Sequence, residues 1–254
     1  MTEDDEKSGI LGGAEPAARL SRRDLLRFGL AGGAASLLSA CGWDGGKSVR
    51  PSLSWFSRVN DRVGEGLWLS KDRLAPVYAL SERTPERAFP AYFISRPVPT
   101  LEDPAAWSLE LGGLIRKPQR LTLAMLEALP RLTYTVKHHC VEGWTAIGTW
   151  TGVPFATIAA LADPLPEARY LRFDSFDKDY YNGFDLKSAM HPQTILAYAF
   201  NDRPLTPPRG APLRLYSPVK LGYKMTKYLT KITWTAERPG GYWEDRGYPW
   251  FGGI

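Results

Sequence analysis

Residues 137–144 read KHHCVEGW, and this stretch holds the main clue to the architecture of the 254-residue chain. Cys140 is one of only two cysteines, and it directly follows a lysine and two of the three histidines. The preceding residues 132–136, LTYTV, are rich in β-branched and aromatic side chains, which favour a strand. The pattern therefore predicts a strand that carries the chain up to the His-His-Cys segment.

Four chemistries fit a lone cysteine in this position. It can be a small buried hydrophobic residue, a zinc ligand, a soft donor to a metal already held by an organic ligand, or a nucleophile with His139 or His191 as its base. Neighbouring side chains on an extended segment point to opposite faces, so His138, His139 and Cys140 do not share one ion, which disfavours zinc. Lys137 and the histidines are expected to favour the thiolate.

The beginning of the chain predicts an export signal. The basic segment SRRDLLR, residues 21–27, precedes the weakly hydrophobic run FGLAGGAASLLSA, residues 28–40. The paired arginines are typical of twin-arginine export, and LSAC, residues 38–41, of a lipoprotein signal. A lipid on Cys41 would anchor an exported protein to a membrane surface, in the periplasm or on the outer face of the cell membrane. The alternative is a disordered tail with a chance arginine pair.

The remaining chain divides into an irregular lead-in, residues 42–90, and a domain over residues 91–254. Its composition, 44% hydrophobic and 23% charged, is that of a globular protein. Helices are expected at 123–129, 154–161 and 185–190, turns at 151–154 and 201–204, and an acidic and aromatic loop after residue 173. Strands are expected at 108–111, 132–136, 170–173, 195–200, 212–216 and 231–235. This irregular alternation predicts an α+β fold with mixed β-sheets and short helices.

Seven basic residues lie within residues 203–231 and are interleaved with proline and glycine. Proline stiffens a loop, glycine lets its backbone approach a ligand closely, and arginine and lysine bind phosphate, so this segment could form a phosphate site. The alternative is that these basic residues only form a solvated surface. The net charge of +5 also favours anionic partners, but no nucleic-acid-binding module is recognisable. The seven are Arg203, Arg209, Arg214, Lys220, Lys224, Lys227 and Lys231.

Several motifs occur together in a fixed order between residues 91 and 237. HCVEGW at 139–144 is followed by WTGVP at 150–154, MHP at 190–192, LAY at 196–198 and GAPLRL at 210–215. In this order they resemble the sulfite oxidase family of molybdopterin-dependent oxidoreductases. The likeness is greatest to the bacterial periplasmic branch of methionine-sulfoxide reductase catalytic subunits.

This resemblance implies a sulfite-oxidase-type molybdopterin-binding domain in which Cys140 binds molybdenum. It also implies which residues surround the pterin and its phosphate: Tyr92, Cys140, Ser175, Arg209, Arg214, Met225, Thr226 and Lys227. The implied activity is two-electron oxygen-atom transfer on a small substrate, which can contain sulfur. Electrons would be exchanged with a membrane-bound or soluble redox partner.

Glu142 and His139 are candidates for the proton or substrate path beside Cys140. Two other functions stay open: a non-catalytic protein of this fold that binds at the membrane surface, and a cysteine-dependent hydrolase. The branch has Asn where Arg209 stands and Ser-Ile where Met225-Thr226 stand, so the substrate is left undetermined. The carboxy-terminal GYWEDRGYPWFGGI, residues 241–254, either packs its aromatic rings across the domain or forms the mouth of a site.

Overall fold

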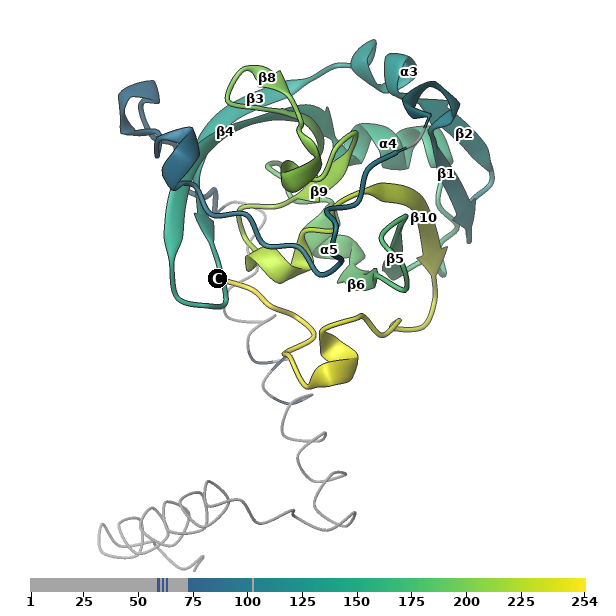
Figure 1. Cartoon of the computed structure of the whole chain (residues 1–254). Helices are drawn as coiled ribbons and strands as arrows, with labels where there is room; N and C mark the ends of the chain where they lie inside the picture. Colours follow the sequence, from purple (N-terminus) through teal and green to yellow (C-terminus); the bar gives the residue numbers. More distant parts are fainter. Residues whose placement is uncertain (1–58, 60, 62, 64–72, 102) are drawn as a thin grey trace, which may run out of the picture. The chain divides into compact units, whose positions relative to one another are not determined.

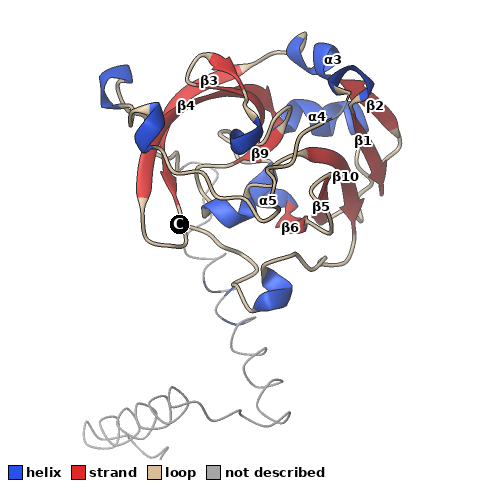
Figure 2. Ribbon diagram, viewed as in Figure 1, coloured by secondary structure: helices blue, strands red, loops and turns tan. Residues whose placement is uncertain are grey.

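The structure, a computed structural model, describes residues 59, 61, 63, 73–101 and 103–254. Cys41 and the predicted export signal lie outside these residues. Most of the described chain is built around two five-stranded sheets joined by short helices (Figure 1). Figure 2 shows how few and how short the helices are beside the strands. The predicted α+β class with mixed sheets is confirmed.

The first sheet has the strand order β2-β1-β10-β5-β6. The neighbours β1 and β10 run parallel, and the other neighbouring pairs are antiparallel. This pairing joins the two ends of the domain, because β1 is the first strand and β10 the last. The strands are β1 Ser108–Gly113, β2 Gln119–Thr122, β5 Tyr170–Ser175, β6 Tyr181–Asp185 and β10 Leu229–Thr235.

The second sheet is antiparallel, with β3, β4 and β7 side by side and both β8 and β9 on the far edge of β7. Asn201 and Asp202 have φ of 48° and 66°, so they form the tight corner that the sequence predicts between β7 and β8. The strands are β3 Leu132–His139, β4 Thr145–Pro154, β7 Ile195–Phe200, β8 Arg203–Pro204 and β9 Arg214–Tyr216.

The α-helices are short, and α3 and α5 begin at capping side chains. The Thr122 Oγ1 accepts a hydrogen bond from the Met125 N–H at 3.3 Å, and an Asp185 carboxylate oxygen accepts one from the Ser188 N–H at 2.6 Å. The helices are α3 Leu123–Glu127, α4 Phe155–Ala162 and α5 Leu186–Ala189, with 3₁₀ turns η1 Leu80–Glu82, η2 Glu86–Ala88, η3 Pro104–Ala106, η4 Pro207–Arg209, η5 Gly222–Lys224 and η6 Glu244–Arg246. No helix in the described part of the chain has both the length and the apolar character to cross a bilayer.

Strands β2, β4, β6 and β8 were not expected from the sequence, and two of them bear on specific predictions. Residues 151–154 belong to strand β4 rather than to a turn, because the strand bulges at Thr151/Gly152 and β7 approaches it closely there. Tyr181–Asp185, expected within a loop, forms β6, which pairs with β5 at the edge of the first sheet. Both features depend on a neighbouring strand.

Two hydrophobic clusters hold the sheets together. The larger one combines residues of both sheets with α4, including Phe155, Phe173 and Trp234. The smaller one lies on the second sheet and includes Trp150 and Phe89. Phe89 comes from the predicted lead-in, and Val77 of the same segment bridges to Val136 of β3. The described part of the lead-in therefore packs on the domain, and a domain boundary at residue 91 stays a prediction.

Candidate functional site

A cleft with an empty volume of about 1000 Å³ opens next to the second sheet. This volume includes the space at the open mouth of the cleft. The lining comes from segments far apart in the sequence: residues 89–94, the β3–β4 hairpin, the loop at 177–180, residues 208–228 and the carboxy-terminal segment. It includes Tyr92, Cys140, Glu142, Arg209, Arg214, Met225 and Lys227.

The β3–β4 hairpin fixes the position of Cys140. Its N–H donates to the Trp144 carbonyl at 3.0 Å, and its carbonyl accepts from the Gly143 N–H at 3.1 Å. Gly143 has φ of 89°, which glycine adopts without steric cost. The Cys140 Sγ lies 3.6 Å from a Glu142 carboxylate oxygen, and the Trp144 indole N–H donates to that same oxygen at 2.9 Å. The thiol is half-buried and is not in a disulfide.

The thiol is not activated by its surroundings. Burial raises the pKa of Cys140, the Glu142 charge raises it further, and the Glu142 and Val141 backbone N–H groups offset only part of this. Lys137 lies over the Tyr78 ring, with its Nζ 5.2 Å from the ring centroid. The expectation that Lys137 and the histidines favour the thiolate was wrong. A thiol with a raised pKa is a poor nucleophile, whereas a metal ion displaces the proton of a coordinating thiol outright.

Arg209, Arg214 and Lys227 bring three cations to the cleft. The Arg209 guanidinium donates to the Phe89 carbonyl at 2.7 Å and pairs with Glu86 at 3.2 Å. The Arg214 guanidinium donates to backbone carbonyls, including that of Met225 at 3.2 Å. The Lys227 ammonium donates to the Pro208 and Tyr92 carbonyls.

These cations are desolvated with little negative charge beside them. Burial lowers the pKa of Lys227 well below its usual value, and the Arg214 and Arg209 charges lower it further, with only Asp177 acting in the opposite direction. Burial likewise lowers the pKa of Arg214 to about 10. Within the described chain, only Arg209 of the three has a carboxylate ion pair. Buried cations in this state are stabilised by an anionic ligand, and phosphate suits arginine forks.

The remaining predicted site residues lie in different places. Tyr92 lines the cleft, and its half-exposed ring contacts Trp243 at a centroid distance of 6.2 Å. Ser175 does not line the cleft, but its hydroxyl accepts from the Asp177 N–H at 3.0 Å and so shapes the 177–180 loop. Thr226 is fully buried and His139 is partly buried, and neither is among the lining residues.

The structure adds lining residues that sequence reasoning missed. His138, Trp144 and Trp150 come from the hairpin, and Tyr180 and Tyr223 from the opposite segments. Burial, followed by the Arg214 and Lys227 charges, lowers the pKa of His138 to about 3. The period of two along β3, which puts His138 on the same face as Cys140, was the signal that could have identified it.

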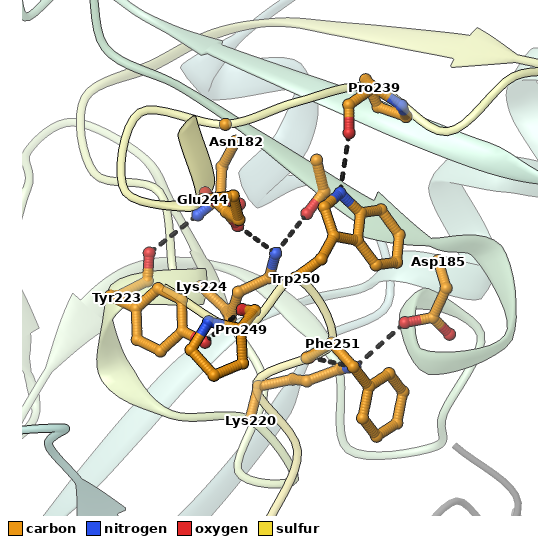
Figure 3. A network of polar contacts seen from close by, with 12 residues as sticks. Asn182, Asp185, Lys220, Tyr223, Lys224, Pro239, Glu244, Pro249, Trp250 and Phe251 are labelled. Carbon is orange, nitrogen blue, oxygen red and sulfur yellow. Dashed lines mark hydrogen bonds and ion pairs between the residues drawn. The ribbon is translucent and has the colours of Figure 1, made fainter. Parts of the chain in front are cut away.

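The carboxy-terminal segment contributes to both packing and the mouth of the cleft. Trp243 and Tyr248 line the cleft, whereas Trp250 and Phe251 are buried. Two lysines of the basic segment hold this region in place (Figure 3). Lys220 pairs with Asp185 at 3.0 Å and donates to the Phe251 carbonyl. Lys224 pairs with Glu244 and donates to the Gly183 carbonyl. These lysines are therefore structural, and the seven basic residues do not form one surface.

The donor set defines the class of group that the cleft can hold. Among the residues that the structure describes, no three His, Cys, Asp or Glu side chains gather as ligands for a metal ion. The cleft instead combines one thiol, aromatic walls and three cations. This combination fits a soft metal whose other ligands come from a planar organic molecule bearing a phosphate.

Residues 95–243 match the family model described as the oxidoreductase molybdopterin binding domain. The chain belongs to this family, and it is a molybdenum-dependent oxidoreductase with the molybdopterin cofactor. A relative in Azospira oryzae, "Putative protein-methionine-sulfoxide reductase subunit YedZ1", is 40% identical over 233 residues, which cover 92% of this chain and 88% of the relative.

Other similar proteins extend beyond this chain. The protein-methionine-sulfoxide reductase catalytic subunit MsrP of Gluconobacter oxydans is 34% identical over 157 residues, covering 55% of this chain and 50% of the relative. The sulfane dehydrogenase SoxCD from Paracoccus pantotrophus has a similar fold, with a TM-score of 0.52 at 22% identity over 56% of this chain and 41% of that one. The chain thus spans about half of the MsrP protein.

Proposed function

We propose that this oxidoreductase transfers an oxygen atom to or from a small substrate in a two-electron reaction, with Cys140 as the protein ligand of the molybdenum. The observation that supports this most is the presence in one cleft of a thiol that is not in a disulfide and of three cations, of which only Arg209 has a carboxylate ion pair among the described residues. When bound, the molybdenum cofactor supplies the oxygen-atom chemistry. The side chains of the cleft bind it, orient it and control its surroundings.

Arg209, Arg214 and Lys227 are the residues that would hold the cofactor phosphate. Backbone carbonyls already fix their charged groups, so little side-chain entropy is lost when an anion binds. Tyr92 and Met225 complete the lining on this part of the cleft.

Glu142 is the better of the two candidates for the proton or substrate path. Its carboxylate lies beside the Cys140 Sγ and is held by the Trp144 indole N–H. His139 is not among the lining residues, so we assign it no contact with the substrate. A carboxylate fixed next to the metal ligand is well placed to accept or donate a proton.

Sulfoxides are the first substrate class to test, because similar proteins are named as methionine-sulfoxide reductases. Those names also describe subunits, which supports a separate redox partner for this chain. We further propose export and a lipid on Cys41, with attachment to the periplasmic or outer face of a membrane, on the basis of residues 21–41 alone.

The test begins with molybdenum analysis of the purified full-length protein, where about one metal per chain is expected. Loaded protein is then assayed for reduction of sulfoxides and N-oxides with a reduced dye, and for oxidation of sulfite with an oxidised dye. Cys140→Ser should lower turnover by at least about 100-fold, because loss of a residue that only hydrogen-bonds to a metal ligand already costs about 10- to 100-fold. Cys41→Ser is the matched control and should retain the wild-type turnover per molybdenum.

Three results would contradict the proposal. Full activity in Cys140→Ser would exclude this thiol from the reaction. Loaded protein without oxygen transfer to or from any of these substrates would favour a binding role at a membrane surface. Metal-free protein with a reactive thiol and esterase activity would favour the cysteine hydrolase.

A further inference from the structure

His138 lies on the cleft face of β3, two residues before Cys140, and is only 7% exposed. Its imidazole is surrounded by aromatic rings. The ring centroids of Trp144, Tyr216 and Phe89 lie 5.6, 5.9 and 5.9 Å away. A hydrophobic side chain would fill such an environment at lower cost, because a buried polar group without a partner destabilises the fold.

No hydrogen bond to the described chain satisfies this imidazole. Its Nδ1 is enclosed and has no hydrogen-bond partner among the described residues. Its Nε2 faces Gly222, another lining residue, and a Cβ added to that glycine would lie 2.7 Å from Nε2. The missing Cβ keeps the space beside Nε2 clear.

The surroundings of the two ring nitrogens indicate which of them carries the proton and can donate a hydrogen bond. A neutral imidazole carries its proton on one nitrogen and a lone pair on the other. Nδ1 is buried without a partner in either tautomer, and buried N–H donors without a partner are rarer in proteins than acceptors without one. The proton therefore belongs on Nε2, which can donate into the cleft.

His138 shares the cleft with the two residues that would hold the ends of the cofactor. Cys140 lies two residues further along the chain, just after the end of β3, and lines the same cleft. Arg214 packs against the same two rings as His138, because its guanidinium lies 4.9 Å from the Trp150 ring centroid and 6.0 Å from that of Tyr216. A ligand that reaches from Cys140 to Arg214 therefore occupies the same cleft as the His138 imidazole.

We infer that His138 is a cofactor-binding residue whose Nε2–H donates a hydrogen bond to an oxygen or ring-nitrogen acceptor of the molybdopterin between the metal and the phosphate. This inference rests on the proposed function, in which Cys140 and Arg214 hold those two groups. It gives a role to a polar side chain that packing alone does not explain.

The first test measures how fast purified, loaded protein releases its cofactor, from the fluorescence of the oxidised pterin. His138→Met keeps the volume but cannot donate, so it should release the cofactor about 3- to 10-fold faster, the equivalent of one hydrogen bond. His138→Gln keeps a donor near the Nε2 position and should restore much of the wild-type rate. His191→Met is the control: this histidine is also buried, but its nitrogens lie 3.2 Å from the Gln193 N–H and the Arg73 carbonyl, outside the cleft lining.

The outcomes separate this inference from the proposed function. Wild-type protein that never contains molybdenum would overturn both. Wild-type release from loaded, folded His138→Met would overturn only the role of His138, as would equally rapid release from His191→Met.

A second measurement needs no variant, in case His138→Met does not fold. Nitrogen-15 spectra of the histidines in oxidised, loaded wild-type protein report which ring nitrogen carries the proton. A protonated Nε2 in His138 is expected. A lone pair on Nε2 in the loaded protein would overturn the inference.

Discussion

The buried basic residues between Arg203 and Lys231 fall into two groups, which differ in whether a carboxylate or a backbone carbonyl accepts their hydrogen bonds. Lys220 and Lys224 are 1% exposed and are paired with the buried carboxylates of Asp185 and Glu244. Arg214 and Lys227 instead donate to backbone carbonyls, which compensate a charge less well than a carboxylate does. The first group needs no ligand, and we propose that the second receives an anion.

The buried Asp185–Lys220 pair predicts an acid-dependent contribution to stability. Burial alone would raise the pKa of Asp185, but the Lys220 charge and the Ser188 hydrogen bonds lower it below its usual value. Its charge therefore stabilises the fold fully above the unfolded pKa of about 3.9, and this contribution is lost as the pH falls through the lower folded pKa. Asp185→Asn should lower the free energy of unfolding at pH 7 by about 3–5 kcal/mol.

Urea unfolding of wild type and Asp185→Asn between pH 7 and pH 2 checks this expectation. The difference in stability between the two proteins should shrink as the pH falls from about 4, and it should be smallest below the folded pKa, where Asp185 is uncharged in the folded protein too. A difference that stays constant down to pH 2 would contradict it. Asp163→Asn is the control, since its pair with Arg116 is exposed and is expected to contribute less than about 1 kcal/mol.

At the scale of elements, close contact between β4 and β7 shapes the sheet beside the cleft. A Cβ at Gly152 of β4 would lie 2.1 Å from the Leu196 carbonyl oxygen and 2.6 Å from the Ala197 Cα of β7. The obstacle is backbone, so a side chain cannot rotate away to make room. Trp150, two residues earlier in β4, lines the cleft, and the strand spacing therefore also positions a wall of the site.

Gly152→Ala should destabilise the protein by about 1–3 kcal/mol, because the strands have to move apart. Gly112 in β1 is the matched control, since an added Cβ there would meet nothing within 4 Å. Gly112→Ala should change stability by no more than about 0.5 kcal/mol. Urea unfolding measures both variants, and equal effects would show that the β4–β7 contact is not what constrains Gly152.

At the scale of the described domain, the carboxy-terminal segment is tied to the core through the Lys224–Glu244 pair and the neighbouring contacts in Figure 3. Its Trp243 and Tyr248 line the cleft. Residues at the end of the chain thus shape a site whose thiol lies more than 100 residues earlier. The stability of this segment and the shape of the cleft depend on the same contacts.

Lys224→Met should destabilise the protein by about 3–5 kcal/mol, because it leaves the Glu244 carboxylate buried without its cation. The double variant Lys224→Met/Glu244→Leu should recover most of this loss, since an apolar pair of similar volume has no charge to desolvate. Urea unfolding of the single and double variants gives the coupling between the two positions. Additive losses in the double variant would show that the two side chains act independently.

The sequence by itself determined much of this protein. Local patterns located six of the strands and the α-helices, because side-chain periodicity acts within a few residues. The order of the motifs from His139 to Leu215 identified the family, and the lone Cys140 identified the expected metal ligand. Seven of the predicted site residues line the observed cleft.

Only the tertiary structure decided which side chains meet. It formed β6 by pairing it with β5, divided the basic residues into those paired with carboxylates and those facing the cleft, and brought His138 beside Gly222. It also placed Ser175, Thr226 and His139 away from the cleft lining, and Trp243 and Tyr248 within it. Burial and charge pairing arise between residues distant in sequence, and a local pattern does not record them.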